Sequence, residues 1–91
     1  MFEKNDYGKP ISEKLSSVLR RNTTKGDFAN VATQTNISFS TIRDVVYRTN
    51  SLTKSNSKGI EVLIKTAFNN AVAHQLMAES DKLFLDRILS P

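Results

Sequence analysis

The chain has 91 residues, of which 38% are hydrophobic and 24% are charged, which predicts one globular domain. It contains no Cys, no Trp and a single His, which excludes a disulfide scaffold, a cysteine-ligated zinc site and a cysteine nucleophile. His74 has no partner pattern around it, so we expect no catalytic residues, no metal site and no cofactor. Because the chain lacks a membrane-length apolar run and a signal-peptide pattern, we expect a soluble, cytoplasmic protein with no membrane partner.

The net charge of +4 is distributed unevenly along the chain. Residues 14–65 carry nine Lys and Arg against three Asp and Glu, a net charge of +6. Residues 1–13 and 66–91 each carry a net charge of −1. A basic segment is typical of a nucleic-acid-binding surface, but it is equally typical of a solvated face, so charge alone leaves both interpretations open.

The first elements in chain order are an arm and an amphipathic helix. Residues 1–10 are polar, contain Gly8 and Pro10, and predict a flexible arm. From Ile11 onwards, apolar residues recur at the spacing of a helix with one buried face. This helix ends near Arg20 and Arg21, whose positive charges suit the C-terminal turn of a helix.

Polar residues divide the rest of the chain into further helical segments. Asp27 is a candidate cap for a second helix, which Asn36 ends, and Ser38 is a candidate cap for a third. After a polar loop, Ser57 is a candidate cap for a strongly periodic fourth helix. Ser80 caps a fifth unless the fourth helix continues through it. Since no segment alternates as a strand would, we expect an all-α fold: a compact bundle of four or five helices.

Residues 28–47, FANVATQTNISFSTIRDVVY, predict two short helices joined by a tight turn. Ala32 is small enough for the helix backbones to approach where they cross, and Asn36 tolerates the positive φ that the turn needs. The apolar residues expected to hold the two helices together are Val31, Ile37, Ile42 and Val45.

This spacing resembles the helix-turn-helix of DNA-binding regulators such as lambda-repressor-like and lactose-repressor-like proteins. The resemblance covers about residues 11–72, and we assign residues 11–78 to a helix-turn-helix domain. The sequence departs from the usual pattern at Asn36, where Gly is more common, and at Thr35, where an apolar residue is more common. The polar loop before the fourth helix is also longer than in compact repressor domains.

The resemblance implies that a recognition helix, about residues 38–48, lies in the major groove and reads base edges. Arg43 is the best candidate reader, because its guanidinium can bind guanine in bidentate fashion. Phe39 could belong to the core instead, and Asp44 could pair with Arg48 four residues later. The expected base contacts are Phe39, Ser40, Thr41, Arg43 and Asp44, and the expected phosphate contacts are Thr24, Lys25, Tyr47, Arg48, Lys54, Ser57 and Lys58.

Residues 79–91 predict an apolar C-terminal helix that either packs on the domain's own core or forms a homodimer. A dimer is attractive because one helix-turn-helix module buries little surface on DNA. The residues expected at the dimer contact are Leu76, Leu83, Phe84, Ile88 and Leu89.

These observations favour a small regulator of bacterial or phage type that binds double-stranded DNA and carries no enzyme activity. The alternative is a helical protein-interaction or assembly module, for example a phage packaging or replication accessory.

Overall fold

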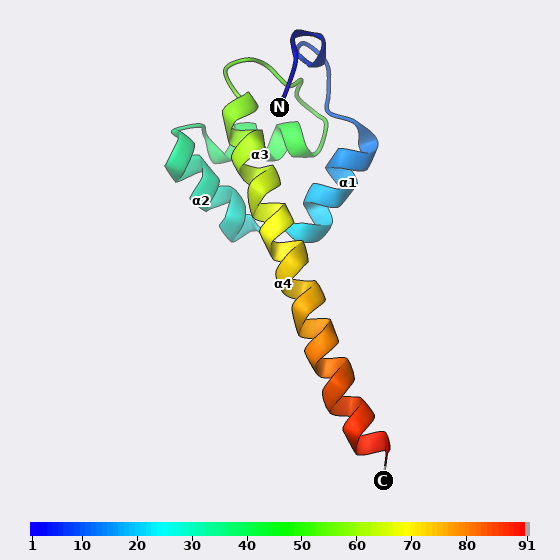
Figure 1. The fold of residues 1–91 in the computed structure, drawn as a ribbon. Coiled ribbons are helices and arrows are strands. Elements are labelled where there is room, and N and C mark those ends of the chain that lie inside the picture. Colours follow the sequence, from blue (N-terminus) through cyan, green and yellow to red (C-terminus); the bar gives the residue numbers. More distant parts are fainter. Residues whose placement is uncertain (91) are drawn as a thin grey trace.

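The computed structural model describes residues 1–90 and confirms the expected all-α class. Its four α-helices are α1 (Glu13–Asn22), α2 (Lys25–Thr35), α3 (Phe39–Val46) and α4 (Ser57–Leu89) (Figure 1). A short 3-10 helix, η1 (Lys4–Asp6), precedes them. Within the described residues the only β-type pairing is an isolated bridge between Lys9 and Leu52.

The first two helices begin at hydroxyl side chains that satisfy a free backbone N–H group. Ser12 caps α1, so Ile11 precedes the helix although its side chain is buried in the core. Thr24, and not the expected Asp27, caps α2. Asp27 is the third residue of α2 and its carboxylate accepts the Thr24 N–H at 3.0 Å, which completes a capping box.

The prediction that a serine caps the helix is confirmed for α3 and is wrong for α4. Ser38 caps α3 and accepts the N–H of Thr41 at 3.1 Å. Asn56 is the N-terminal boundary residue of α4, and Ser57 is its first helical residue. The boundary therefore lies one residue earlier than expected. The Asn56 side chain does not cap the helix; it accepts the N–H of Thr53, in the loop, at 2.8 Å.

The turn between α2 and α3 has the predicted conformation. Asn36 has a φ of 58°, in the left-handed region, and ends α2. Val31, Ile42 and Val45 are buried on either side of the turn, as expected, and Ile37 packs partly buried against them. The segment 25–46 therefore forms a helix-turn-helix unit in which apolar side chains fix the crossing of the two helices.

A single core forms between the three short helices and the N-terminal half of α4. Apolar side chains from all four helices converge there, together with one from the N-terminal segment and one from the loop. The buried residues are Ile11, Leu19, Phe28, Val31, Ile42, Val45, Val46, Leu52, Ile60, Leu63 and Ala67.

α4 crosses the helix-turn-helix unit closely because Gly59 has no side chain. A Cβ atom placed on Gly59 would lie 3.1 Å from the Cδ1 of Ile37 and 3.4 Å from the Cγ1 of Ile42. The first distance is shorter than an ordinary van der Waals contact between carbon atoms, and the second is at the lower limit of that range. Gly59 thus sets the distance between the first turns of α4 and α3.

Of the two alternatives for the C-terminal segment, the structure has the continuous one: α4 runs through Ser80 as one helix of 33 residues, and no separate fifth helix begins there. No Gly or Pro lies between Gly59 and Pro91, so the sequence contains no strong helix breaker there. Residues 71–90 are all exposed, and the helix extends away from the bundle instead of folding back on the core (Figure 1). The described chain therefore measures 59 × 25 × 20 Å.

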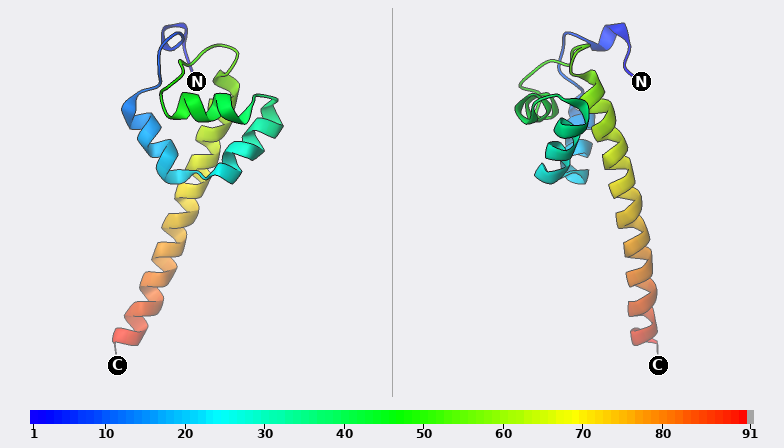
Figure 2. Two further views of the ribbon diagram at one scale, coloured as in Figure 1. Left: turned by 180° about the vertical axis from the view of Figure 1, so that it is seen from behind. Right: turned by 90° about the vertical axis from the view of Figure 1, so that its left-hand side faces the viewer.

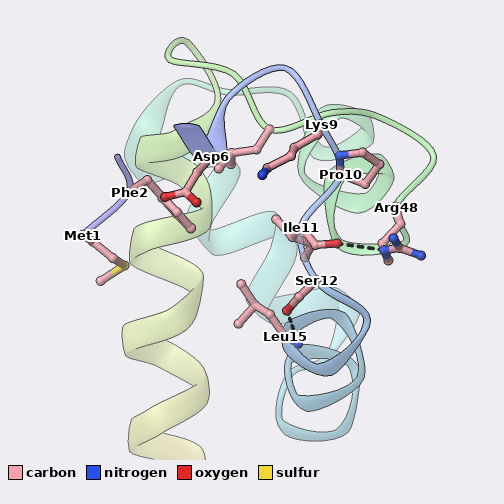
Figure 3. A pocket seen from close by; sticks show the side chains of 10 residues that line it. Met1, Phe2, Asp6, Lys9, Pro10, Ile11, Ser12, Leu15 and Arg48 are labelled. Carbon is pink, nitrogen blue, oxygen red and sulfur yellow. Dashed lines mark hydrogen bonds between the residues drawn. The ribbon is translucent and has the colours of Figure 1, made fainter. Parts of the chain in front are cut away.

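The N-terminal segment, expected to be a flexible arm, lies instead against the loop before α4. The Gly8 N–H donates to the carbonyl of Leu52 at 2.8 Å, and the Leu52 N–H donates to the carbonyl of Lys9 at 3.0 Å. Gly8 reaches this position with a φ of 84°, which glycine adopts without strain. Between this segment, α1 and Arg48 lies a hollow of about 550 Å³ (Figure 3).

Candidate nucleic-acid interface

The predicted recognition helix, α3, lies on the outer side of the bundle. Figure 2 shows it across from α4, with α1 and α2 flanking it. Its inner side chains Ile42, Val45 and Val46 are fully buried. Ser40, Arg43 and Tyr47 are exposed, so α3 and its C-terminal residue present one polar face to solvent.

A hollow of about 320 Å³ joins α3 to the start of α2. The residues that line it come from both helices of the helix-turn-helix unit and from the turn after α3: Lys25, Phe28, Phe39, Arg43, Asp44, Tyr47 and Thr49. Five of them are sequence-predicted DNA contacts: Lys25, Phe39, Arg43, Asp44 and Tyr47. The fold therefore brings Lys25 and Arg43 to the same surface, although 18 positions separate them in the chain.

Arg20 adds a cation to this surface and was not among the predicted contacts. Its guanidinium carbon lies 5.6 Å from the centroid of the exposed Tyr47 ring. Its Nε also donates to the Ser16 carbonyl at 3.4 Å, which directs the side chain along α1. The sequence predicted only that Arg20 lies in the C-terminal turn of a helix. Its contact with a residue that follows another helix has no local sequence signal.

We define the α3 surface as five exposed residues and one half-buried carboxylate: Arg20, Lys25, Ser40, Arg43 and Tyr47, together with Asp44. Within it, Arg43 Nε donates to Asp44 Oδ1 at 3.0 Å, with side chains that are 49% and 36% exposed. An exposed pair of this kind is worth at most about 1 kcal/mol, so the guanidinium can exchange this partner for another acceptor. The α3 surface carries three cationic side chains and one carboxylate.

Arg48 does not pair with Asp44, contrary to the alternative drawn from their spacing. α3 ends at Val46, and Arg48 has a φ of 65°, so the helical spacing no longer holds there. Its Nε donates to the carbonyl of Ile11 at 2.7 Å (Figure 3). Its Nη1 lies 3.4 Å from the Glu13 carboxylate. Arg48 therefore ties the end of α3 to the start of α1, which occupies part of the guanidinium expected to contact phosphate.

The other predicted base contacts differ in how far they are exposed. Phe39 is half-buried, and its ring lies 5.9 Å from that of Phe28, so it belongs partly to the core, as the alternative interpretation had it. Thr41 is also half-buried, and its hydroxyl accepts a hydrogen bond from Ser38 at 2.7 Å. Ser40 is exposed at the N-terminus of α3.

The remaining predicted phosphate contacts are dispersed. Thr24 is exposed beside Lys25, but its hydroxyl caps α2. Lys54 and Lys58 are exposed near the start of α4 and do not line the hollow between α3 and α2. Ser57 is wrong as a side-chain contact, because it is buried and its hydroxyl donates to the Lys54 carbonyl at 3.1 Å.

Residues 1–90 contain no cluster of His, Asp and Glu side chains arranged to hold a metal ion. None of the described helices combines the length and apolar character needed to cross a membrane. His74 is exposed on α4.

Comparison with known proteins identifies no relative of this chain. No family model, no curated protein and no solved structure matches the chain significantly.

Proposed function

We propose that the chain binds double-stranded DNA by placing α3 in the major groove. The observation that carries the proposal is the placement of α3, whose inner face is fully buried while its outer face meets cationic side chains from α1 and α2. A helix presented on the outside of a domain fits the major groove, and flanking cations neutralise the adjacent phosphates.

In this proposal the side chains of the α3 surface divide between bases and backbone. Arg43 and Ser40 point outward from α3 and read base edges, with Arg43 exchanging Asp44 for guanine O6 and N7. Lys25, Arg20 and the Tyr47 hydroxyl contact phosphates on either side of the groove. Lys25 is also the first residue of α2, where the positive end of the helix dipole favours an anion.

Fluorescence anisotropy with a labelled duplex of random sequence tests the proposal. We expect binding at low ionic strength that weakens steeply as salt is added, and a several-fold loss of affinity for Arg43→Ala. Lys65→Ala is the matched control, because it removes the same charge from an exposed position of α4. Absence of binding at low salt, or equal losses for the two variants, would contradict the proposal.

We also propose that the chain acts as a homodimer through the exposed part of α4. Leu76, Leu83, Phe84, Ile88 and Leu89 are each more than half exposed within the described chain. Large contiguous apolar surfaces are uncommon on monomers and mark interaction sites. Sedimentation velocity over a range of concentrations gives the mass: a dimer supports this proposal, and a monomer at all concentrations contradicts it.

The same exposed apolar residues favour a second candidate function, that of an interaction module for a different protein. This candidate predicts no salt-dependent duplex binding, whereas the DNA-binding proposal requires it. The anisotropy measurement therefore separates the two candidates.

A further inference from the structure

The apolar residues in the C-terminal half of α4 lie on a stripe of their own. The core-facing stripe of α4 contains Ile60, Leu63 and Ala67, and its helical continuation passes through Asn70 and His74. Leu76, Met77, Leu83 and Phe84 lie off that line, and they follow the i, i+1, i+7, i+8 spacing of one helix face. This second stripe is therefore not a continuation of the core-facing stripe.

The second stripe is symmetric about Ser80. Met77 and Leu83 lie three residues to either side of it, and Leu76 and Phe84 lie four residues to either side. Val72 and Ile88 continue the symmetry at eight residues. All six side chains are exposed, and nothing within the described chain covers them.

We propose that two copies of this chain pair antiparallel along this stripe, with the two-fold axis passing beside Ser80. In an antiparallel pair centred on Ser80, each residue lies level with the residue at the mirrored position of the partner, and residues on the same side of the stripe pack together. Leu76 then meets Leu83 of the partner subunit, and Met77 meets Phe84 of the partner subunit. The stripe is thus self-complementary, as a two-fold interface requires. This inference deepens the dimer proposed above by giving it an orientation and a register.

Size and charge at position 87 favour the antiparallel orientation over a parallel one. Arg87 lies on the stripe seven residues after Ser80, and Ala73 lies seven residues before it. In a parallel pair the two Arg87 guanidinium groups face each other and repel. In the antiparallel pair each Arg87 lies opposite a small Ala73, which leaves room for its long side chain.

The net charge of the C-terminal segment and the area of the stripe are both compatible with a second copy of the chain packing on it. Residues 66–91 carry a net charge of −1 with both signs interspersed, so two copies repel only weakly there. Pairing over the length of the stripe buries on the order of 1,000 Å² in total, about the lower limit of a specific interface. Leu85 and Leu89 lie on the opposite side of α4, so Leu89 falls outside the contact that the sequence suggested for it.

The antiparallel orientation has a consequence for the proposed DNA binding. Ile60 lies 20 residues before Ser80, which is about 30 Å along a helix. The two helix-turn-helix units then lie about 60 Å apart at opposite ends of the pair, nearer to two turns of DNA than to one.

Disulfide cross-linking of the full chain, performed without DNA, tests the orientation. The chain contains no cysteine, so each introduced thiol is unique. Ala73→Cys and Arg87→Cys are oxidised mildly, first separately and then as an equimolar mixture. We expect the mixture to yield the mixed 73–87 dimer as the main product, with little cross-linking of either variant alone. Self-cross-linking of both variants alone, without the mixed product, indicates a parallel pair and overturns the proposal.

Two control variants complete the experiment. Ser80→Cys lies beside the proposed axis and is expected to cross-link with itself. Ala78→Cys lies on the opposite side of α4 and is expected to remain uncross-linked. Equal cross-linking of all four variants indicates random collision, and no cross-linking of any indicates no pairing; either result overturns the proposal. Because DNA is absent, failure here leaves the anisotropy result intact, and the reverse also holds.

Discussion

The guanidinium of Arg20, at the end of α1, lies over the ring of Tyr47, at the end of α3, with 5.6 Å between the guanidinium carbon and the ring centroid. Tyr47 also lines the hollow that contains Lys25 and Arg43. Three helices therefore contribute cationic side chains around one exposed aromatic ring. This arrangement places three of the nine Lys and Arg residues of the segment 14–65 beside the helix proposed to read DNA.

We predict that Arg20→Ala weakens binding to every duplex by a similar factor. Arg20 is proposed to contact phosphate, which carries no sequence information. Losing one phosphate contact lowers the slope of log affinity against log salt by about 1. Anisotropy titrations at several salt concentrations measure this slope. A loss confined to particular sequences would assign Arg20 to base reading instead.

Asp44→Asn is expected to strengthen binding to a duplex of random sequence by up to about fivefold. The substitution removes the only carboxylate of the α3 surface, which repels phosphate, and exposed charge interactions are worth up to about 1 kcal/mol. It also frees Arg43 from its ion pair at no cost in shape. The comparison uses the same labelled duplex at low salt. An unchanged or weaker affinity would indicate that Asp44 does not face the DNA backbone.

Ser16→Ala is expected to lower the free energy of unfolding by about 1–3 kcal/mol. The buried Ser16 hydroxyl donates to the carbonyl of Val46, the last residue of α3, and its loss leaves that carbonyl without this partner. Urea denaturation followed by circular dichroism measures the effect. Ser17→Ala is the matched control, because Ser17 is less buried and its hydroxyl accepts only from the exposed Arg21; we expect its effect to be within about 0.5 kcal/mol. Equal effects of the two substitutions would contradict the role assigned to Ser16.

Gly59→Val is expected to destabilise the fold by about 1–3 kcal/mol, because its side chain must displace Ile37 and Ile42. Gly59→Ala should change stability little, since the gain in helix propensity offsets a contact that is short by a few tenths of an ångström. Gly26→Ala is the control in α2, where a Cβ atom would lie at an ordinary 3.5 Å from Thr24 Oγ1. It should be neutral or stabilising by up to about 1 kcal/mol. Thermal melts of the three variants give the order of their stabilities. A Gly59→Val variant as stable as the unmodified chain would contradict the close approach of α4 to Ile37 and Ile42.

The sequence predicted the features that depend on local chemistry. Asn36 tolerates a positive φ, and Ser38 provides a hydroxyl next to an apolar helix, so the turn and the start of α3 were both predictable. The buried face of α3 followed from its periodicity.

Features that depend on tertiary contacts were not predictable in this way. The spacing of Asp44 and Arg48 suggested an ion pair, but α3 ended first and Arg48 turned to Ile11 and Glu13. Arg20 joined the α3 surface through a packing of α1 against α3 that no local pattern encodes. The fifth helix did not form because a capping residue such as Ser80 cannot end a helix without a breaker nearby.

The most direct test of the central claim maps the DNA contact on the whole chain by NMR. Amide ¹H–¹⁵N spectra are recorded while a short duplex is added at low salt. We expect the largest shift changes at the amides of Lys25, Ser40 and Arg43, and small changes from Leu83 to Leu89. Shift changes concentrated in the C-terminal half of α4, or none at all, would contradict the claim that α3 binds DNA.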